Sequence, residues 1–335
     1  MGCTHLLIPP PNFGTLWINR RAPQASAAVR HWGEASFLAE RSQWKMEANM
    51  QMTRIARRAF TGLAAACLAL VTLAGAHAET TLEKAKREGY IRVGFANEAP
   101  YGFATPDGKL TGESPEVVKA VLKKMGINQV DGVLTEFGSL IPGLQAGRFD
   151  IIAAGMFITP KRCEQVQFSE PTYGIGQAFL VKKGNPKSIK DYGTIASEKG
   201  LKLAVMAGAV EGGYAKDAGI DQSRLVVLPD QSSLVKAVQA GRADAAALTA
   251  LSIADMASKN EGVESTPPFG TVAGKSVVGH GGVAFRKDDK ELYEAFNAEL
   301  KKFIGSPEHI ALVTPFGFGK GFLPTKTTAQ LCAGE

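Results

Sequence analysis

The chain has 335 residues, of which 45% are apolar and 21% charged, so it is long enough for one or two well-cored domains, and its composition does not suggest disorder. A formal charge of +6 ordinarily raises the question of nucleic acid or an anionic membrane as a partner. Residues 1–78, however, hold eight of the 38 basic and three of the 32 acidic residues, which leaves 30 and 29. This near balance argues against a nucleic-acid partner.

The first 78 residues have the organisation of a leader. The basic portion is Arg54, Arg57 and Arg58. An apolar run follows over 62–73, and residues 76–78 form the cleavage site. We expect a secretory signal peptide over 46–78, cleaved after Ala78, and a periplasmic location. The apolar run is about a dozen residues, shorter than the roughly 20 that a membrane-spanning helix needs. Residues 1–45 have no place in such a signal and are interpreted as a start-site artefact.

After the leader, short strand-like runs alternate with helical patterns. The predicted elements are a strand over 91–96, a helix over 114–125, a strand near 130–136, a short helix from 140 and a strand over 151–155. In the first helix Ser114 is the expected N-cap, Pro115 suits the first turn and Gly126 ends the run. Alternation with continuous apolar strands predicts a mostly parallel sheet covered on both faces.

One sequence pattern recurs at an offset of 94 residues. Ser139, Leu144, residues 145–148 and Asp150 correspond to Ser233, Val238, residues 239–242 and Asp244. A single helix that is capped by glycine and followed by a buried strand is common. Two copies at one offset favour two similar α/β lobes.

Two glycine-rich passages, 173–177 and 279–282, lead into predicted strands. Glycine absorbs large changes in φ and ψ, so both passages are natural hinges. The expected division is 79–173 with 283–335 as lobe one, and 178–278 as lobe two. A last helix over about 290–305 carries an apolar face that packs back on lobe one.

Two cysteines follow the leader, Cys163 and Cys332. An exported chain meets an oxidising compartment, so a disulfide between them is one interpretation. Two free buried thiols are the other, because the sequence does not give the distance between their Cα atoms.

The signatures of common catalytic sites do not occur in the sequence after the leader. The two histidines there, His280 and His309, lie near no cysteine or acidic pair that would form a metal site or a catalytic triad. We therefore expect no catalytic residue, no metal, no cofactor and no enzymatic activity.

Aromatic and charged residues follow three predicted strands, in segments 97–103, 136–139 and 155–162. Ligands of open α/β sheets bind outside the carboxyl ends of the strands, so these segments are expected to converge on one cleft. The cleft would offer one anion, one cation and three aromatic faces. The residues are Glu98, Arg162, Tyr101, Phe137 and Phe157.

Five motifs, taken together, point to one family. They are 91–94 (Ile-Arg-Val-Gly), 112–116 (Gly-Glu-Ser-Pro-Glu), 144–150, 155–162 and 168–173. From Glu79 onward the chain resembles the family 3 solute-binding proteins of polar amino-acid ABC importers. The resemblance implies a type II periplasmic-binding-protein fold, with two α/β lobes, a two-segment hinge and a ligand cleft between the lobes. It also implies a monomer that delivers a small ligand to an ABC permease and ATPase complex.

The resemblance assigns a carboxylate-binding role to Arg162, the arginine of the Ile-Thr-x-x-Arg segment, whose planar fork suits two carboxylate oxygens. The chain departs from amino-acid binders at two places. Phe157 stands where they usually have a hydroxyl residue, and Leu248 and Thr249 stand where they have an acid for the α-ammonium group. These departures remove an ammonium partner and add an aromatic surface.

The combination resembles the ectoine- and hydroxyectoine-binding members of the family. By this resemblance Arg162 holds the ligand carboxylate, Glu98 holds the ring N–H groups, and three aromatic residues form a cage around the delocalised cation. The other ligand-binding candidates are Gly155, Thr159, Val210 and Thr249. Backbone N–H groups over 208–211, where a strand opens a helix, are also placed to meet the carboxylate. The alternative roles are core packing for the aromatic residues and a turn cap for Glu98.

Three other functions remain open from the sequence. The first is binding of another polar or basic amino acid or an opine, which stays in the transport class. The second is a dehydratase-type enzyme on the same fold with Glu98 as its acid, although no paired proton carrier is evident. The third is a sensor domain.

Overall fold

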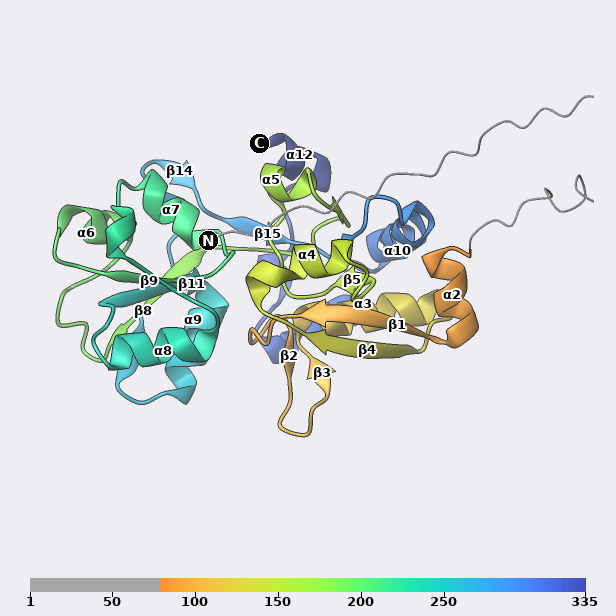
Figure 1. The fold of residues 1–335 in the computed structure, drawn as a ribbon, viewed down its shortest axis with the longest axis horizontal. Helices are drawn as coiled ribbons and strands as arrows, with labels where there is room; N and C mark the ends of the chain where they lie inside the picture. The colour runs from red at the N-terminus through yellow and green to blue at the C-terminus, as the bar shows by residue number, and fades with distance from the viewer. Residues whose placement is uncertain (1–78) are drawn as a thin grey trace, which may run out of the picture. The chain divides into compact units, whose positions relative to one another are not determined.

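The computed structural model describes residues 79–335, and the expectations for residues 1–45 and for the signal peptide over 46–78 lie outside this range. Among the described residues, no helix combines the length and the apolar character needed to cross a membrane. Two five-stranded sheets with helices packed around them dominate this part of the chain (Figure 1).

The first sheet is built mainly from residues before 170. Its strands, in spatial order, are β4 (Gln129–Leu134), β1 (Tyr90–Phe95), β5 (Ile151–Ile152), β16 (Ala284–Phe285) and β6 (Gln167–Phe168). β1 runs parallel to β4 and β5, and only β16 runs the opposite way. The predicted strand over 151–155 is shorter in the structure, because the chain leaves the sheet and turns at Gly155, where φ is +63°.

The helices of this part surround the sheet, and the two longest bury apolar stripes. They are α2 (Thr81–Glu88), α3 (Glu113–Lys124), η1 (Phe137–Ser139), α4 (Leu140–Gln145), α5 (Pro160–Cys163), α10 (Lys290–Phe303), α11 (Pro307–Val313), η3 (Thr314–Phe316), η4 (Lys320–Phe322) and α12 (Thr328–Ala333), with a hairpin of β2 (Phe103–Ala104) and β3 (Leu110–Thr111). Residues at helical spacing are buried in α3 (Val117, Val118, Val121, Leu122) and in α10 (Leu292, Phe296, Leu300, Phe303). Each such side chain contributes about 1.5–3 kcal/mol on burial.

Two expectations about helix ends were wrong. Helix α3 begins at Glu113 with Gly112 as its N-cap, so Ser114 lies inside the first turn, buried, and does not cap the helix. Gly112 adopts a φ of +119°, which only glycine reaches readily, and this places the N-cap two residues earlier than expected. Helix α10 is not the last, because α11 and α12 follow it, each started by its own hydroxyl cap, Ser306 and Thr327.

The second sheet is built from residues 177–265. Its strands, in spatial order, are β10 (Leu225–Leu228), β9 (Leu203–Met206), β11 (Ala245–Thr249), β8 (Gln177–Lys182) and β12 (Val263–Ser265). Only β8 runs against the others. The accompanying elements are α6 (Tyr192–Ser197), α7 (Glu211–Asp217), η2 (Gln222–Arg224), α8 (Gln231–Gln239), α9 (Ala250–Lys259), β13 (Thr271–Val272) and β14 (Lys275–Ser276).

The internal repeat of the sequence corresponds to equivalent positions in the two sheets. In each sheet the repeat supplies the third strand in the order, β5 or β11, and the aspartate just before that strand. Asp150 accepts a hydrogen bond from the Arg92 N–H and donates its own N–H to the Arg92 carbonyl; Asp244 does the same with Lys202. We propose that the two sheets are the cores of the two lobes, and we call the parts built on them lobe one and lobe two.

The two glycine-rich passages lie side by side as strands β7 (Tyr173–Ile175) and β15 (Gly279–Gly281), paired antiparallel. Glycine is required here, because a Cβ at Gly281 would lie 2.3 Å from the Tyr173 ring and one at Gly279 would lie 2.0 Å from the Phe157 ring. β15 passes between the two halves in Figure 1. The role of this ribbon as a hinge remains our proposal.

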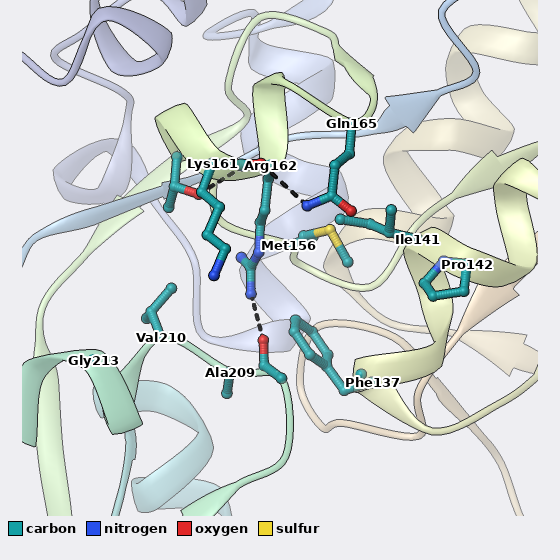
Figure 2. A pocket seen from close by; sticks show the side chains of 13 residues that line it. Phe137, Ile141, Pro142, Met156, Lys161, Arg162, Gln165, Ala209, Val210 and Gly213 are labelled. Carbon is teal, nitrogen blue, oxygen red and sulfur yellow. Dashed lines mark hydrogen bonds between the residues drawn. The ribbon is translucent and has the colours of Figure 1, made fainter.

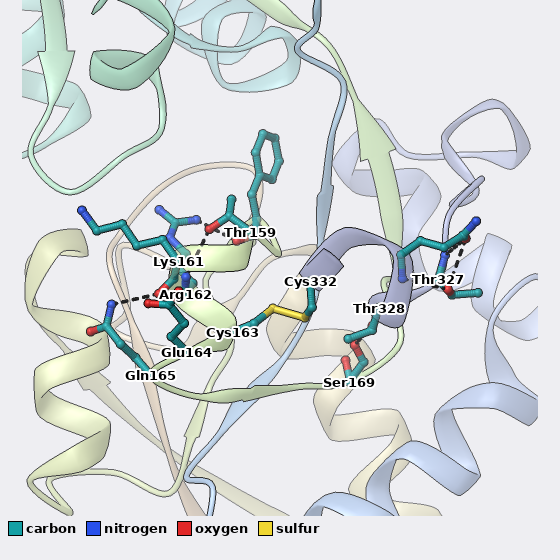
Figure 3. Close-up of a disulfide and its surroundings, with 12 residues drawn as sticks. Thr159, Lys161, Arg162, Cys163, Glu164, Gln165, Ser169, Thr327, Thr328 and Cys332 are labelled. Atoms are coloured by element: carbon teal, nitrogen blue, oxygen red, sulfur yellow. Dashed lines mark hydrogen bonds between the residues drawn. A yellow bond between two sulfur atoms is a disulfide. The ribbon is translucent and has the colours of Figure 1, made fainter. Parts of the chain in front are cut away.

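Cys163 and Cys332 are joined in the structure, with their Cα atoms 5.7 Å apart. The bond ties the one-turn helix α5 to the C-terminal helix α12 (Figure 3). Arg162 precedes Cys163, so the disulfide anchors the short helix that carries this arginine.

Candidate functional site

Two adjoining cavities lie where α5 and η1 of lobe one face the start of α7 in lobe two. The larger, of about 500 Å³, is lined by Phe137, Gly138, Ile141, Pro142, Met156, Thr159, Lys161, Arg162, Gln165, Gly208, Ala209, Val210 and Gly213 (Figure 2). The smaller, of about 20 Å³, is lined by Glu98, Phe137, Gly155, Phe157, Arg162, Met206, Ala209, Val210, Glu211, Leu248 and Thr249. Arg162 and Phe137 line both, so the arginine stands between a roomy compartment and a much smaller one.

Arg162 is placed by the start of α5. The Thr159 hydroxyl caps the helix by accepting from the Arg162 N–H at 3.3 Å, and Pro160 fits the first turn. The guanidinium is buried; it donates to the Phe157 carbonyl at 2.8 Å and, across the cleft, to the Gly208 carbonyl at 2.9 Å (Figure 2). Its carbon lies 5.4 Å from the centre of the Phe137 ring.

Among the residues that the structure describes, no carboxylate forms an ion pair with Arg162. None of the ion pairs among residues 79–335 includes it. Burial lowers the pKa of its guanidinium, because the charged form loses hydration. A buried cation with neutral partners only is a ready site for an anion.

Two buried carboxyl groups face the smaller cavity from opposite lobes. Glu98 follows β1, is 5% exposed, and accepts a hydrogen bond from the Ser252 hydroxyl at 2.9 Å. Glu211 begins α7 and is 2% exposed; the Gln177 amide nitrogen, in the orientation that satisfies both its ends, donates to it at 2.9 Å. Burial raises the pKa of Glu98 to about 8 and that of Glu211 to about 7. Ionised carboxylates here would therefore be stabilised by a ligand cation.

Sequence reasoning missed the carboxylate of Glu211. It considered 208–211 for backbone N–H groups and expected one anion in the cleft, whereas the structure places two there. The available signal was position: Glu211 follows the carboxyl end of strand β9, as Glu98 follows that of β1.

Two of the three aromatic candidates border a cavity. Phe137 and Phe157 line the smaller cavity, but Tyr101 lines neither cavity. Its ring lies behind Gly155, so close that a Cβ there would be 2.5 Å from the Tyr101 Cδ1 atom, and it packs at 5.1 Å from the Tyr173 ring. In the structure two aromatic faces border the cavities and Tyr101 lies beneath them, and the cage of three aromatic faces stays a prediction.

The remaining candidates lie at the cavities. Gly155, Val210 and Thr249 line the smaller one, and Val210 also borders the larger one. Thr159 lines only the larger one, where its hydroxyl serves as the cap of α5.

A third buried carboxyl group lies outside the cavities. Glu113, at the start of α3, is 1% exposed, and burial raises its pKa to about 8. In the unfolded chain the pKa of a glutamate is about 4.3. Between about pH 4.3 and pH 8 the carboxyl group is therefore protonated in the folded state and ionised in the unfolded state. The contribution of Glu113 to the free energy of unfolding is then fully present below about pH 4 and is lost as the pH rises through 8.

We expect Glu113→Gln, a neutral side chain of the same shape, to remove this share of the pH dependence. Between pH 5 and pH 8 the free energy of unfolding of the wild-type protein should fall by on the order of a few kcal/mol more than that of the variant. Urea denaturation at several pH values measures it. The control is Glu116→Gln, on the same helix, where the glutamate is paired with Lys119. Its free energy of unfolding should depend on pH as that of the wild type does. Equal pH dependence of the Glu113 variant and the wild type would contradict the assignment.

Known proteins resemble this chain in sequence and in fold. Residues 91–318 match the family model of bacterial extracellular solute-binding proteins, family 3. A probable amino-acid ABC transporter periplasmic-binding protein of Sinorhizobium fredii is 38% identical over 276 residues, 80% of this chain and 91% of that protein. The lysine/arginine/ornithine-binding periplasmic protein of Escherichia coli is 29% identical, over 63% of this chain and 80% of that protein.

Among solved structures, the crystal structure of EhuB in complex with hydroxyectoine is similar, with a TM-score of 0.71 and 38% identity. The match covers 76% of this chain and 98% of that one.

Proposed function

The chain belongs to family 3 of the bacterial extracellular solute-binding proteins and is a solute-binding protein of the amino-acid ABC importer type with a type II periplasmic-binding-protein fold, and we propose that its ligand is ectoine or hydroxyectoine. We further propose that it is exported to the periplasm, acts as a monomer with a permease and ATPase complex, and catalyses no reaction.

The observation that carries this proposal is the buried guanidinium of Arg162, which has no anionic partner among the described residues, opposite the buried carboxyl group of Glu98. Ectoine is a ring that bears a carboxylate and a delocalised amidinium cation. The ligand carboxylate would pair with Arg162 and the amidinium N–H groups with Glu98. The faces of Phe137 and Phe157 would cover the cation, at about 0.5–2 kcal/mol for each desolvated contact.

Contacts between the lobes support capture by closure. Arg162 of lobe one donates to the Gly208 carbonyl of lobe two, and Ser252 of lobe two donates to Glu98 of lobe one. We propose that the ligand binds first to lobe one and that lobe two then closes over it. Closure excludes water and so strengthens both charge-assisted contacts.

A basic amino acid is the second candidate, and Glu211 favours it. With Glu98 and Glu211 ionised and Arg162 charged, the smaller cavity carries one net negative charge. A ligand with one carboxylate and two cationic groups, such as L-arginine or L-lysine, would balance that charge. The Escherichia coli relative is named for ligands of this type.

Calorimetric titration of the exported protein with ectoine, hydroxyectoine, L-arginine and L-lysine separates the two candidates. We expect the ectoines to bind with micromolar or tighter affinity and the amino acids to bind far more weakly. Glu211→Gln should change hydroxyectoine affinity by less than about threefold, because one carboxylate suffices for one amidinium, whereas it should weaken any L-arginine binding at least tenfold.

The control for this titration is Glu198→Gln, an exposed glutamate of lobe two, which should leave every affinity unchanged. Tight binding of an amino acid with silent ectoines would keep the importer class and contradict the proposed ligand.

A further inference from the structure

A side chain of lobe two holds the backbone next to Glu98. Gln231, the first residue of α8, uses both ends of its amide on one residue of the loop after β1: its oxygen accepts from the Ala99 N–H at 3.1 Å, and its nitrogen donates to the Ala99 carbonyl at 2.9 Å. The two residues are 132 positions apart in the chain. Neither is in the lining of the smaller cavity, so this contact is distinct from ligand binding.

Ser252 makes a second contact of the same kind from α9. Its hydroxyl is fully buried and lies within hydrogen-bond distance of both the Glu98 Oε1 atom, at 2.9 Å, and the Ala99 carbonyl, at 3.2 Å. Two helices of lobe two therefore hold the peptide segment that positions the carboxylate for the ligand cation.

We propose that Gln231 and Ser252 are positioning residues that hold the Glu98–Ala99 segment in its ligand-binding orientation and set the rate of ligand release. We call these two side chains and their bonds to the segment the latch. The inference rests on the proposed function, because it takes Glu98 as the group that binds the ligand cation.

The two members of the latch act differently. The two hydrogen bonds of the Gln231 side chain go to the backbone of Ala99, so they resist separation of the lobes without acting on the carboxylate. Ser252 donates to the carboxylate itself and lowers the pKa of Glu98, against the larger opposing effect of burial. The charged groups that act on Glu98 are Glu211, which raises its pKa, and Arg162, which lowers it, and both stay unchanged when the latch is altered.

The test is stopped-flow kinetics on the full chain after export, with hydroxyectoine and L-arginine as probes. Gln231→Ala should raise the dissociation rate about tenfold at every pH and leave the association rate within about twofold. The reason is that the latch bonds break when the lobes open to release the ligand, whereas the first encounter of ligand and protein does not involve them. Ser252→Ala should also raise the dissociation rate. In addition, its affinity should fall more steeply than that of the wild type from pH 8 to pH 6, since Glu98 without its donor is protonated more readily.

The chain offers a matched control on each helix. Gln239, also on α8, donates to the Glu261 carbonyl within lobe two, and Ser258, also on α9, donates to the Asp255 carbonyl. Gln239→Ala and Ser258→Ala should leave both rates and the pH profile unchanged.

A second readout does not depend on the ligand. Spin labels on cysteines introduced at Lys123 and Lys216, exposed residues on α3 and α7, report the separation of the lobes. Gln231→Ala should reduce the closed population of the ligand-free protein. Unchanged rates and an unchanged closed population in both latch variants would overturn the latch. If neither probe binds the wild-type protein, the proposed ligands fail, and the closed population alone decides on the latch.

Discussion

Replacing Arg162 with alanine is expected to abolish ligand binding and to leave the protein folded. The guanidinium is the buried cation that the ligand carboxylate would meet, and removing one partner of a buried charge pair costs about 3–5 kcal/mol, more than a hundredfold in affinity. The fold should tolerate the change, because burial already disfavours the charged form of this side chain and lowers its pKa. Calorimetry with hydroxyectoine gives the affinity, and circular dichroism with thermal unfolding checks the fold.

Two further variants sharpen this experiment. Arg162→Lys keeps the charge but loses the planar fork, so its affinity should lie between those of the wild type and the alanine variant. Arg148→Ala removes an exposed arginine after α4, away from both cavities, and should leave the affinity within about threefold. Near-normal affinity in a folded Arg162→Ala protein would remove the main support for the proposed function.

Replacing Gly208 with alanine is expected to prevent the lobes from closing. Gly208 has a φ of +76°, and a Cβ built there would lie 2.5 Å from the Cα atom and 3.1 Å from the nitrogen of Gly138 in lobe one. Both neighbours are backbone atoms, which cannot rotate away. The overlap arises only when the lobes close, and overpacking of this kind costs about 1–3 kcal/mol, a loss of affinity of about fivefold to more than a hundredfold.

The control for Gly208 is a glycine with the same backbone conformation and no neighbour. Gly219 has a φ of +81°, lies in the same lobe, and a Cβ at this position would have no contact within 4 Å. Gly219→Ala therefore carries the backbone strain without the steric overlap and should leave the affinity within about threefold. Small-angle X-ray scattering with hydroxyectoine should show a more open Gly208→Ala protein. Normal affinity and normal closure of that variant would show that this contact does not limit closure.

The sequence by itself determined the architecture. Apolar periodicity predicted the buried faces of α3 and α10, since side chains three and four residues apart share one face of a helix. The repeat at an offset of 94 residues predicted a second sheet like the first, and β5 and β11 take the same place in their sheets. A family motif also pointed to Arg162. The threonine cap and the proline that start α5 belong to the same short segment of sequence, so they can be recognised without the tertiary structure.

The tertiary structure alone decided which side chains meet in the site. Tyr101 and Phe137 both follow strands in the sequence, yet only Phe137 reaches the cavities, because Tyr101 lies behind Gly155. The carboxylate of Glu211 and the latch residue Gln231 come from segments more than one hundred positions away from Glu98. Local periodicity reports which face of an element is apolar; which groups become neighbours depends on how the two lobes pack, and that is set by contacts distant in sequence.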